Sequence, residues 1–235
     1  MTDTRPGGNR VKVVFMDLEM KPIPREFRAE RAICAGEVIQ FGAVKLEDDH
    51  EVASYCSVVK PEYGAIPAYI EDMTGVTNGM TVGAATFREG LSGFAEFCAD
   101  ADTIYAWSGT DLAQLEAESR LKDTTALLEP LVKKWSDYQR RFTDCLHLDR
   151  AISLEKALDI ALLSMDGHQH DALCDARNTA KLFLSEKDLA VSKRLRKVAA
   201  QVNSAPTTYS LADKFAGCLA MFGGDDGGEG SGEAE

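Results

Sequence analysis

Apolar positions are dense in residues 11–20, and this stretch predicts a buried β-strand. It is rich in β-branched and aromatic residues, and turn-forming residues lie on both sides of it. Because successive side chains of a strand point to opposite faces, one face carries Val13, Phe15, Asp17 and Glu19. An apolar stripe therefore ends in two neighbouring carboxylates.

Three further strands are predicted by similar patterns. Residues 37–46 and 51–60 are strand-like segments on either side of a short turn, and they predict an antiparallel hairpin. Residues 103–107 predict a fourth strand. It follows a helix expected at residues 87–98, with Thr86 as the N-cap, so we expect this strand to be a parallel and buried member of the sheet.

The rest of the chain predicts helices and one weak strand. Residues 141–146 predict the fifth strand. Helices are expected at residues 67–73, 108–122, 126–134, 153–163 and 171–184. Strands in hairpin order, followed by strands that alternate with helices, predict an α/β fold: a mixed five-stranded sheet flanked by helices, which is the layout of the ribonuclease H-like fold.

Composition divides the chain into four parts. The glycine-rich and acidic residues at the C-terminal end cannot support a packed core, and the first residues are polar. The predicted parts are a disordered N-terminus (1–10), a folded domain (11–184), a C-terminal helical extension (185–222) and a disordered acidic tail (223–235).

Overall composition limits the class of protein. With 45% hydrophobic and 27% charged residues, the chain is typical of a soluble globular protein. A polar N-terminus and no long apolar run predict a cytoplasmic protein without a membrane span. Six cysteines without a C-x-x-C pair, most of them in apolar segments, predict reduced core thiols rather than a zinc site or disulfides. The net charge of −12 argues against a broad basic surface for nucleic acid, but a few phosphate contacts remain compatible with it.

Asp17 and Glu19 have two interpretations. Partly buried like charges raise each other's cost of ionisation, and a divalent metal between them removes that cost. Alternatively, both acids lie in water beyond the strand end. Asp111 follows the fourth strand and is also ambiguous, because an acid in the first turn of a helix capped by Ser108 can serve the cap alone.

The last predicted helix of the folded domain carries two acids. Asp171 and Asp175 are four residues apart, a spacing that destabilises an isolated helix by roughly 0.2–0.5 kcal/mol. The helix dipole favours Asp171 at the helix start, whereas Asp175 borders the apolar face and needs a partner. A metal shared with Asp17 and Glu19 meets that need, and His170 can then reach a water bound to it.

Taken together, these residues resemble a known pattern, that of the DEDDh group of 3′–5′ exonucleases. The group includes ribonuclease T, polymerase proofreading subunits and histone-mRNA-trimming exonucleases. The matching residues are Asp17-x-Glu19, Asp111, His170 and Asp175. The resemblance covers residues 11–184, which would form the exonuclease domain. It includes residues 37–44, which are similar to the second strand of the family, and residues 73–77, which are similar to its Thr-Gly-Ile-Thr segment.

The resemblance implies two Mg²⁺ or Mn²⁺ ions held by Asp17, Glu19 and Asp175, with Asp111 reaching one of them through water. His170 would act as the general base, because imidazole exchanges protons near neutral pH. The implied reaction releases nucleoside 5′-monophosphates from the 3′ end of single-stranded RNA or DNA. By the same analogy, Leu18 and Met20 would line the terminal nucleotide, with Trp107 as a further member of that pocket.

Two matters stay open at this level. The long connection at residues 21–35 resembles the mRNA-trimming branch, which favours RNA slightly over DNA. A non-catalytic module that binds nucleic acid or protein, or a different metal-dependent phosphoesterase, remains an alternative on the same fold. The sequence does not indicate an oligomeric state.

Overall fold

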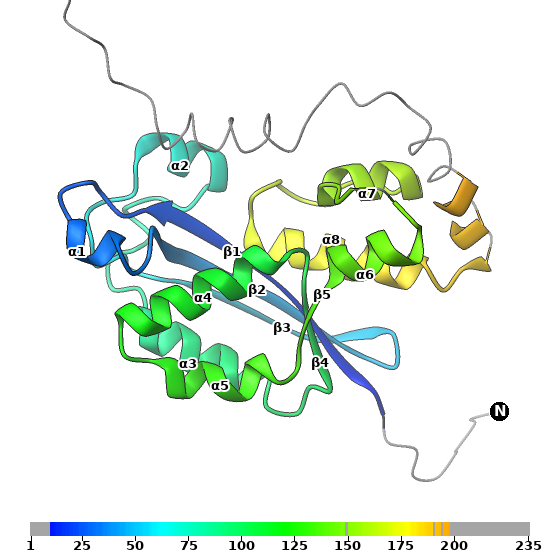
Figure 1. Cartoon of the computed structure of the whole chain (residues 1–235), viewed down its shortest axis with the longest axis horizontal. Helices are drawn as coiled ribbons and strands as arrows, with labels where there is room; N and C mark the ends of the chain where they lie inside the picture. The colour runs from blue at the N-terminus through cyan, green and yellow to red at the C-terminus, as the bar shows by residue number, and fades with distance from the viewer. Residues whose placement is uncertain (1–9, 149, 190, 194, 198–235) are drawn as a thin grey trace, which may run out of the picture.

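The computed structural model describes residues 10–148, 150–189, 191–193 and 195–197 (Figure 1). One five-stranded sheet has the strand order β3-β2-β1-β4-β5. The strands are β1 (Lys12–Pro22), β2 (Gly36–Glu47), β3 (His50–Val58), β4 (Thr103–Ala106) and β5 (Trp135–Asp137). The helices are α1 (Arg28–Arg31), α2 (Ala68–Thr74), α3 (Phe87–Phe97), α4 (Gly109–Leu121), α5 (Thr125–Val132), α6 (Tyr138–Cys145), α7 (Leu154–Ala161) and α8 (Ala172–Ser185).

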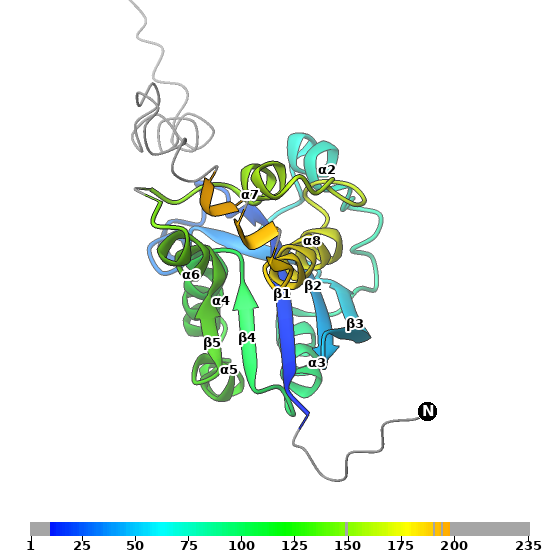
Figure 2. The same cartoon turned by 90° about the vertical axis from the view of Figure 1, so that its right-hand side faces the viewer.

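The sheet is mixed, as the sequence predicts. β2 runs antiparallel to both β1 and β3, whereas β4 runs parallel to β1 and β5 runs parallel to β4. Helices pack on both faces, and α8 lies against β1 and β2 (Figures 1 and 2). The predicted α/β fold with a five-stranded sheet of the ribonuclease H-like type is therefore confirmed.

The position predicted for the fifth strand is wrong. Residues 141–145 belong to helix α6, and the fifth strand is the three-residue segment Trp135–Asp137. The carboxylate of Asp137 accepts a hydrogen bond of 2.8 Å from the backbone N–H of Arg140 and so starts the helix. Tyr138 and Phe142 then lie one turn apart, and both are fully buried. Phe142, the aromatic residue of the predicted strand, thus lies on the buried face of a helix.

The two faces of β1 enter different clusters of the core. Val14, Met16 and Leu18 belong to a cluster that includes residues of α3, α4 and α5. Phe15 lies on the other face and packs with Ala180 and other residues of α8. The predicted alternation along β1 is thus present. Because Asp17 and Glu19 continue the register of Phe15, they follow it on the face that α8 covers.

Side-chain caps fix where three helices begin. Thr86 and Glu89 form a reciprocal capping box at α3. Ser108 accepts a hydrogen bond from the backbone N–H of Thr110 at the start of α4, and Ser153 caps α7. All three caps are those predicted from the sequence.

Other predictions have mixed outcomes. Cys34 and Cys98 are buried, but Cys56 and Cys145 are exposed, so the idea that most cysteines are core thiols is wrong for these two. Within the described residues, no helix has the length and apolar character needed to cross a membrane. The predicted tail (223–235), most of the predicted helical extension (185–222) and nearly all of the N-terminal segment lie outside the described residues, so the division into parts stays a prediction.

Candidate active site

The C-terminal ends of β1 and β4 lie side by side because the two strands are parallel neighbours. Met16 pairs with Ala106, the last residue of β4, and the chain then enters α4. Asp111, in the first turn of α4, therefore comes close to the end of β1. Asp111 is only 5% exposed, and while burial raises the pKa of its carboxyl group, the nearby backbone of Leu18 acts to lower it. The sequence places Asp111 beside Asp17 only if the first and fourth strands are neighbours in the sheet. The structure shows that they are.

Helix α8 is docked by its first residues onto β2. Asp171 is the N-cap and accepts a hydrogen bond of 2.9 Å from the backbone N–H of Cys174. The amide of Gln40 accepts a hydrogen bond of 3.1 Å from the N–H of Ala172 and donates one of 3.4 Å to Asp171. Gly42 lies so close to the helix backbone that a Cβ would overlap with Ala172.

Gln40 and Gly42 were not among the residues predicted for the site. A buried amide and a glycine inside an otherwise apolar strand were the available signals. Gln40 lies opposite Glu19 and Gly42 lies opposite Asp17 in the β1–β2 pair, and both residues hold the helix that carries Asp175. This role is visible only in the tertiary structure.

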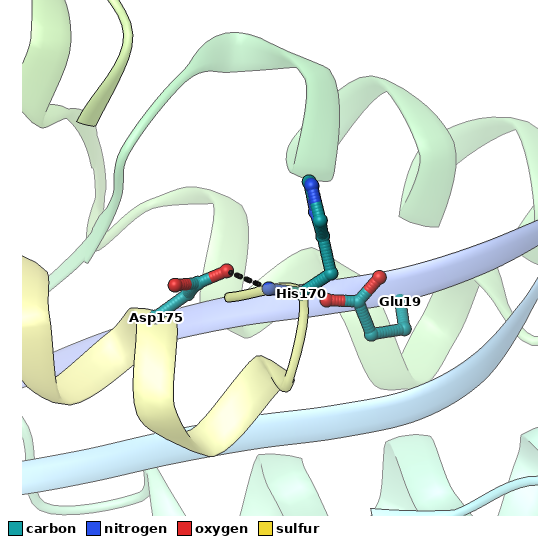
Figure 3. Close-up of side chains that lie close together, drawn as sticks. All are labelled: Glu19, His170 and Asp175. Carbon is teal, nitrogen blue, oxygen red and sulfur yellow. Dashed lines mark hydrogen bonds between the residues drawn. The ribbon is translucent and has the colours of Figure 1, made fainter. Parts of the chain in front are cut away.

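Glu19, His170 and Asp175 come together from β1 and from the N-terminal end of α8. One possible ligand atom of each residue lies within 4.8 Å of those of the other two. The backbone N–H of His170 donates a hydrogen bond of 3.0 Å to Oδ2 of Asp175 (Figure 3). Oδ1 of Asp175 is buried and has no hydrogen-bond partner among the described residues.

The electrostatics of this cluster are unfavourable for four ionised acids. Burial, and then the charges of Asp175 and Asp111, raise the pKa of Glu19 to about 9. Burial, and then the charges of Asp111, Glu19 and Asp175, raise the pKa of Asp17 well above its ordinary value. Burial also raises the pKa of Asp111 to about 7 and raises the pKa of Asp175. Without a cation, the site therefore favours protonated carboxyl groups.

These residues fit a divalent metal of the hard type. The donors are carboxylate oxygens, which Mg²⁺ and Mn²⁺ prefer. The unpartnered Oδ1 of Asp175 is a buried acceptor that needs a positive neighbour. A cation would also offset the burial and repulsion that raise the pKa values of Asp17 and Glu19, and the burial that raises the pKa of Asp111.

The three residues predicted to line the terminal nucleotide all pack in or against the hydrophobic core. Leu18 is 4% exposed and belongs to the core cluster on the opposite face of the sheet, against which Met20 also packs. The ring of Trp107 is 8% exposed and contacts Tyr138 and Phe142. A β-bulge between Glu19 and Met20 changes the register at this point. Contacts of these side chains with a nucleotide stay predictions.

Comparison with known protein families gives one match that covers most of the chain. The exonuclease family RNase_T matches residues 14–183. Two curated relatives are a DNA polymerase III of the PolC type and a DNA polymerase III epsilon subunit. The PolC-type polymerase of Latilactobacillus sakei subsp. sakei (strain 23K) is 28% identical over 161 residues, which are 65% of this chain and 10% of that protein. The epsilon subunit of Aquifex aeolicus (strain VF5) is 41% identical over 64 residues, which are 27% of this chain and 31% of that protein. The matches thus span less than a third of either relative.

Solved structures with a similar fold are exonucleases. The nuclease domain of 3′hExo, a DEDDh family member bound to rAMP, has a TM-score of 0.66 at 19% identity, and the match covers 76% of this chain and 92% of that domain. Product-bound exonuclease I has a TM-score of 0.58 at 14% identity, and the match covers 81% of this chain and 46% of that one. At these identities the likeness shows the fold.

Proposed function

Because the chain belongs to the RNase_T exonuclease family, we propose that it is a metal-dependent 3′–5′ exonuclease of the DEDDh type. It would release nucleoside 5′-monophosphates from the 3′ end of a single-stranded nucleic acid. The observation that carries this proposal is the convergence of Glu19, His170 and Asp175 within 4.8 Å, beside the raised pKa values of Asp17 and Asp111.

In this proposal, Asp17, Glu19 and Asp175 would hold two Mg²⁺ or Mn²⁺ ions, with Asp111 as a further acidic group at the same site. When bound, such a pair of ions activates the attacking water and stabilises the leaving 3′ oxygen. The burial of Glu19 and Asp111 supports this role, since a carboxylate that is only 6% or 5% exposed is poorly solvated in the free protein.

His170 is the proposed general base. Its side chain is exposed, while its backbone N–H is held by Asp175. The imidazole can therefore meet a water molecule at the edge of the acidic cluster and take its proton. Asp175 would thus have two roles. Its Oδ2 holds the backbone of His170, while its Oδ1, which has no hydrogen-bond partner among the described residues, would be available to a metal.

We propose that the substrate is a single-stranded nucleic acid, with RNA favoured slightly over DNA. The solved neighbour with a TM-score of 0.66 was crystallised with rAMP, and another neighbour concerns recognition of a histone mRNA stem-loop. The curated relatives, by contrast, are a DNA polymerase III of the PolC type and the epsilon subunit of a DNA polymerase III. The cytoplasmic location expected from the sequence stays a prediction.

A labelled-oligonucleotide assay tests the proposal. Matched single-stranded RNA, single-stranded DNA and duplexes carry a label at either the 3′ or the 5′ end, and each is digested with Mg²⁺, with Mn²⁺ or with a chelator. Stepwise shortening from the 3′ end, with release of mononucleotides only when metal is present, is the expected result. Internal cleavage would indicate a different phosphoesterase, and binding without cleavage would indicate a non-catalytic module.

A further inference from the structure

One face of helix α8 binds the loop that precedes the helix. Asp175, Asn178 and Lys181 are spaced three residues apart, so their side chains follow one another along that face. Asp175 accepts the hydrogen bond from the backbone of His170. Lys181 donates to the carbonyl of Ser164 at 2.9 Å and pairs with the carboxylate of Asp166 at 2.7 Å. The loop is thus bound at several points by the helix that follows it.

Asn178 makes the buried part of this attachment. Its side chain is fully buried, and its amide oxygen accepts a hydrogen bond of 2.9 Å from the N–H of Asp166. Its amide nitrogen donates to the carbonyl of Asp166, also at 2.9 Å, and lies 3.0 Å from the sulfur of Met165. Asn178 therefore satisfies both backbone groups of a single loop residue, which only a side chain with a donor and an acceptor can do.

The loop needs such attachment because its backbone is unusual. His170 has a φ of +66°, in the left-handed region that residues other than glycine rarely adopt. Gly167 has a φ of +78°, and a Cβ there would overlap with the sulfur of Cys174. The left-handed backbone of His170 persists only when the surrounding structure holds it, whereas glycine adopts a positive φ without strain. Asp166 and His170 mark the two ends of the segment that is held.

We propose that Asn178 is a positioning residue for His170. It fixes one end of the loop at residues 166–170 while Asp175 fixes the other, and the two bonds together set where the imidazole stands relative to Glu19 and Asp175. The inference about catalysis rests on the proposed role of His170 as general base. The inference about the loop rests on the hydrogen bonds alone.

The experiment compares Asn178→Leu with a matched control, Thr179→Val, in the full-length protein. Leucine has a similar volume and keeps the helix, but it makes no hydrogen bond to Asp166. Thr179 is also buried on α8, and among the described residues its hydroxyl donates a hydrogen bond only to the carbonyl of Asp175 within the helix. Both variants lose one buried polar group, whereas Asn178→Leu alone releases the loop.

Amide hydrogen exchange measured by NMR gives a readout that does not depend on activity or metal. The amide of Asp166 loses its acceptor directly in Asn178→Leu. The amide of His170 keeps Asp175 as its acceptor, so faster exchange at His170 reports release of the whole loop. We expect exchange at His170 to rise at least about tenfold in Asn178→Leu and to stay unchanged in Thr179→Val. Unchanged exchange at His170 in Asn178→Leu would overturn the proposal.

Turnover measured in a double-mutant cycle tests whether Asn178 acts through His170. We expect Asn178→Leu to lower kcat by about tenfold or more with little change in KM, and to cause no further loss in a His170→Ala background. Equal losses in both backgrounds would show a role unrelated to His170. If Asn178→Leu does not fold, Asn178→Ser keeps one hydrogen-bonding group and takes its place. If His170→Ala has normal turnover, the proposed function of His170 fails, and the exchange measurement still decides the role of Asn178 in the loop.

Discussion

Lys21 and Glu37 form an ion pair of 2.9 Å in which both side chains are fully buried. The two residues face each other across β1 and β2, and Lys21 comes two residues after Glu19. A second cation, Lys122 of the α4 C-cap, lies 3.0 Å from the same carboxylate. The end of β1 that carries the acidic cluster is therefore anchored by a buried pair of opposite charges.

Lys21→Met is expected to destabilise the protein by about 3 kcal/mol, because it leaves the buried charge of Glu37 with one cation instead of two. Urea unfolding followed by circular dichroism measures the change. Lys133→Met is the control, since Lys133 and Glu129 form an exposed pair with side chains 74% and 73% exposed. An exposed pair contributes little, so the control should unfold like the wild type. Equal stability of Lys21→Met and the control would contradict the prediction.

The same carboxylate predicts how stability depends on pH. Although burial alone would raise the pKa of Glu37, the charge of Lys122, hydrogen bonds from Glu62 and Lys21 and the charge of Lys21 lower it below its ordinary value of 4.5. A group with a lowered pKa in the folded state stabilises the protein fully above 4.5, and this contribution is lost as the pH falls through the folded-state pKa. The difference in unfolding free energy between wild type and Glu37→Gln should be constant from pH 7 to about pH 5.5 and shrink at lower pH. If the difference in unfolding free energy instead grows as the pH falls, the pKa of Glu37 is raised in the folded protein and the prediction is wrong.

The sequence predicted the parts of the fold that rest on local patterns. The alternation in β1 correctly places Asp17 and Glu19 on the face of Phe15, and the three caps follow from residue type. The fifth strand could not be placed in this way. A strand of three residues is too short to show a hydrophobic alternation, and its extended backbone is set by pairing with β4.

The supporting residues of the site were missed for a related reason. Gln40 binds the backbone of Ala172, a residue 132 positions away in the chain. Asn178 binds Asp166, 12 positions away, through its backbone groups. No spacing rule connects a side chain to a distant backbone group, so such contacts appear only when the tertiary structure is known. Three of the four acids were predicted from local patterns, because Asp17 and Glu19 follow a strand period and Asp175 borders the apolar face of a helix. Asp111 was predicted from its position just after the fourth strand.

Asp17→Asn is expected to abolish hydrolysis while the protein stays folded. The substitution removes a proposed metal ligand, and with it a carboxyl group whose pKa is raised first by burial and then by repulsion from Asp111, Glu19 and Asp175. In chelator, the variant should therefore melt at the same temperature as the wild type or higher. Added Mn²⁺ should raise the melting temperature of the wild type more than that of the variant, because binding to the folded state stabilises it. Normal metal-dependent activity of Asp17→Asn, or of Asp175→Asn, would exclude the proposed metal site.

His170→Ala should lower turnover by roughly 10²- to 10⁴-fold, the usual contribution of a general base, while calorimetry still detects Mn²⁺ binding. His168→Ala is the matched control. Both histidines are exposed in the same loop, but only His170 belongs to the cluster with Glu19 and Asp175. His168→Ala should keep most of its activity. The reverse result, an inactive His168 variant beside an active His170 variant, would show that the wrong histidine has been assigned.

Gly42→Ala tests the docking of α8 on β2. A Cβ at this position would overlap with the backbone of Ala172 and Leu173, and backbone atoms at a helix start cannot move aside without moving the helix. We expect a loss of about 3 kcal/mol in unfolding free energy, comparable to severe overpacking in a core. Because Asp175 and His170 move with the helix, turnover should fall more than stability alone explains at temperatures where the variant is fully folded.

Gly79→Ala provides the comparison for this last change, since the nearest atom to its Cβ would be the hydroxyl of Thr77 at 3.6 Å, an ordinary contact. Gly79→Ala should leave both stability and turnover close to those of the wild type. The decisive measurement is the Mn²⁺ affinity of Gly42→Ala, obtained by calorimetry below its melting transition. Weakened affinity together with reduced turnover shows that the close approach of β2 and α8 sets the distance between Glu19 and Asp175. Unchanged affinity and turnover in folded Gly42→Ala would mean that the helix accommodates the methyl group without moving its acid.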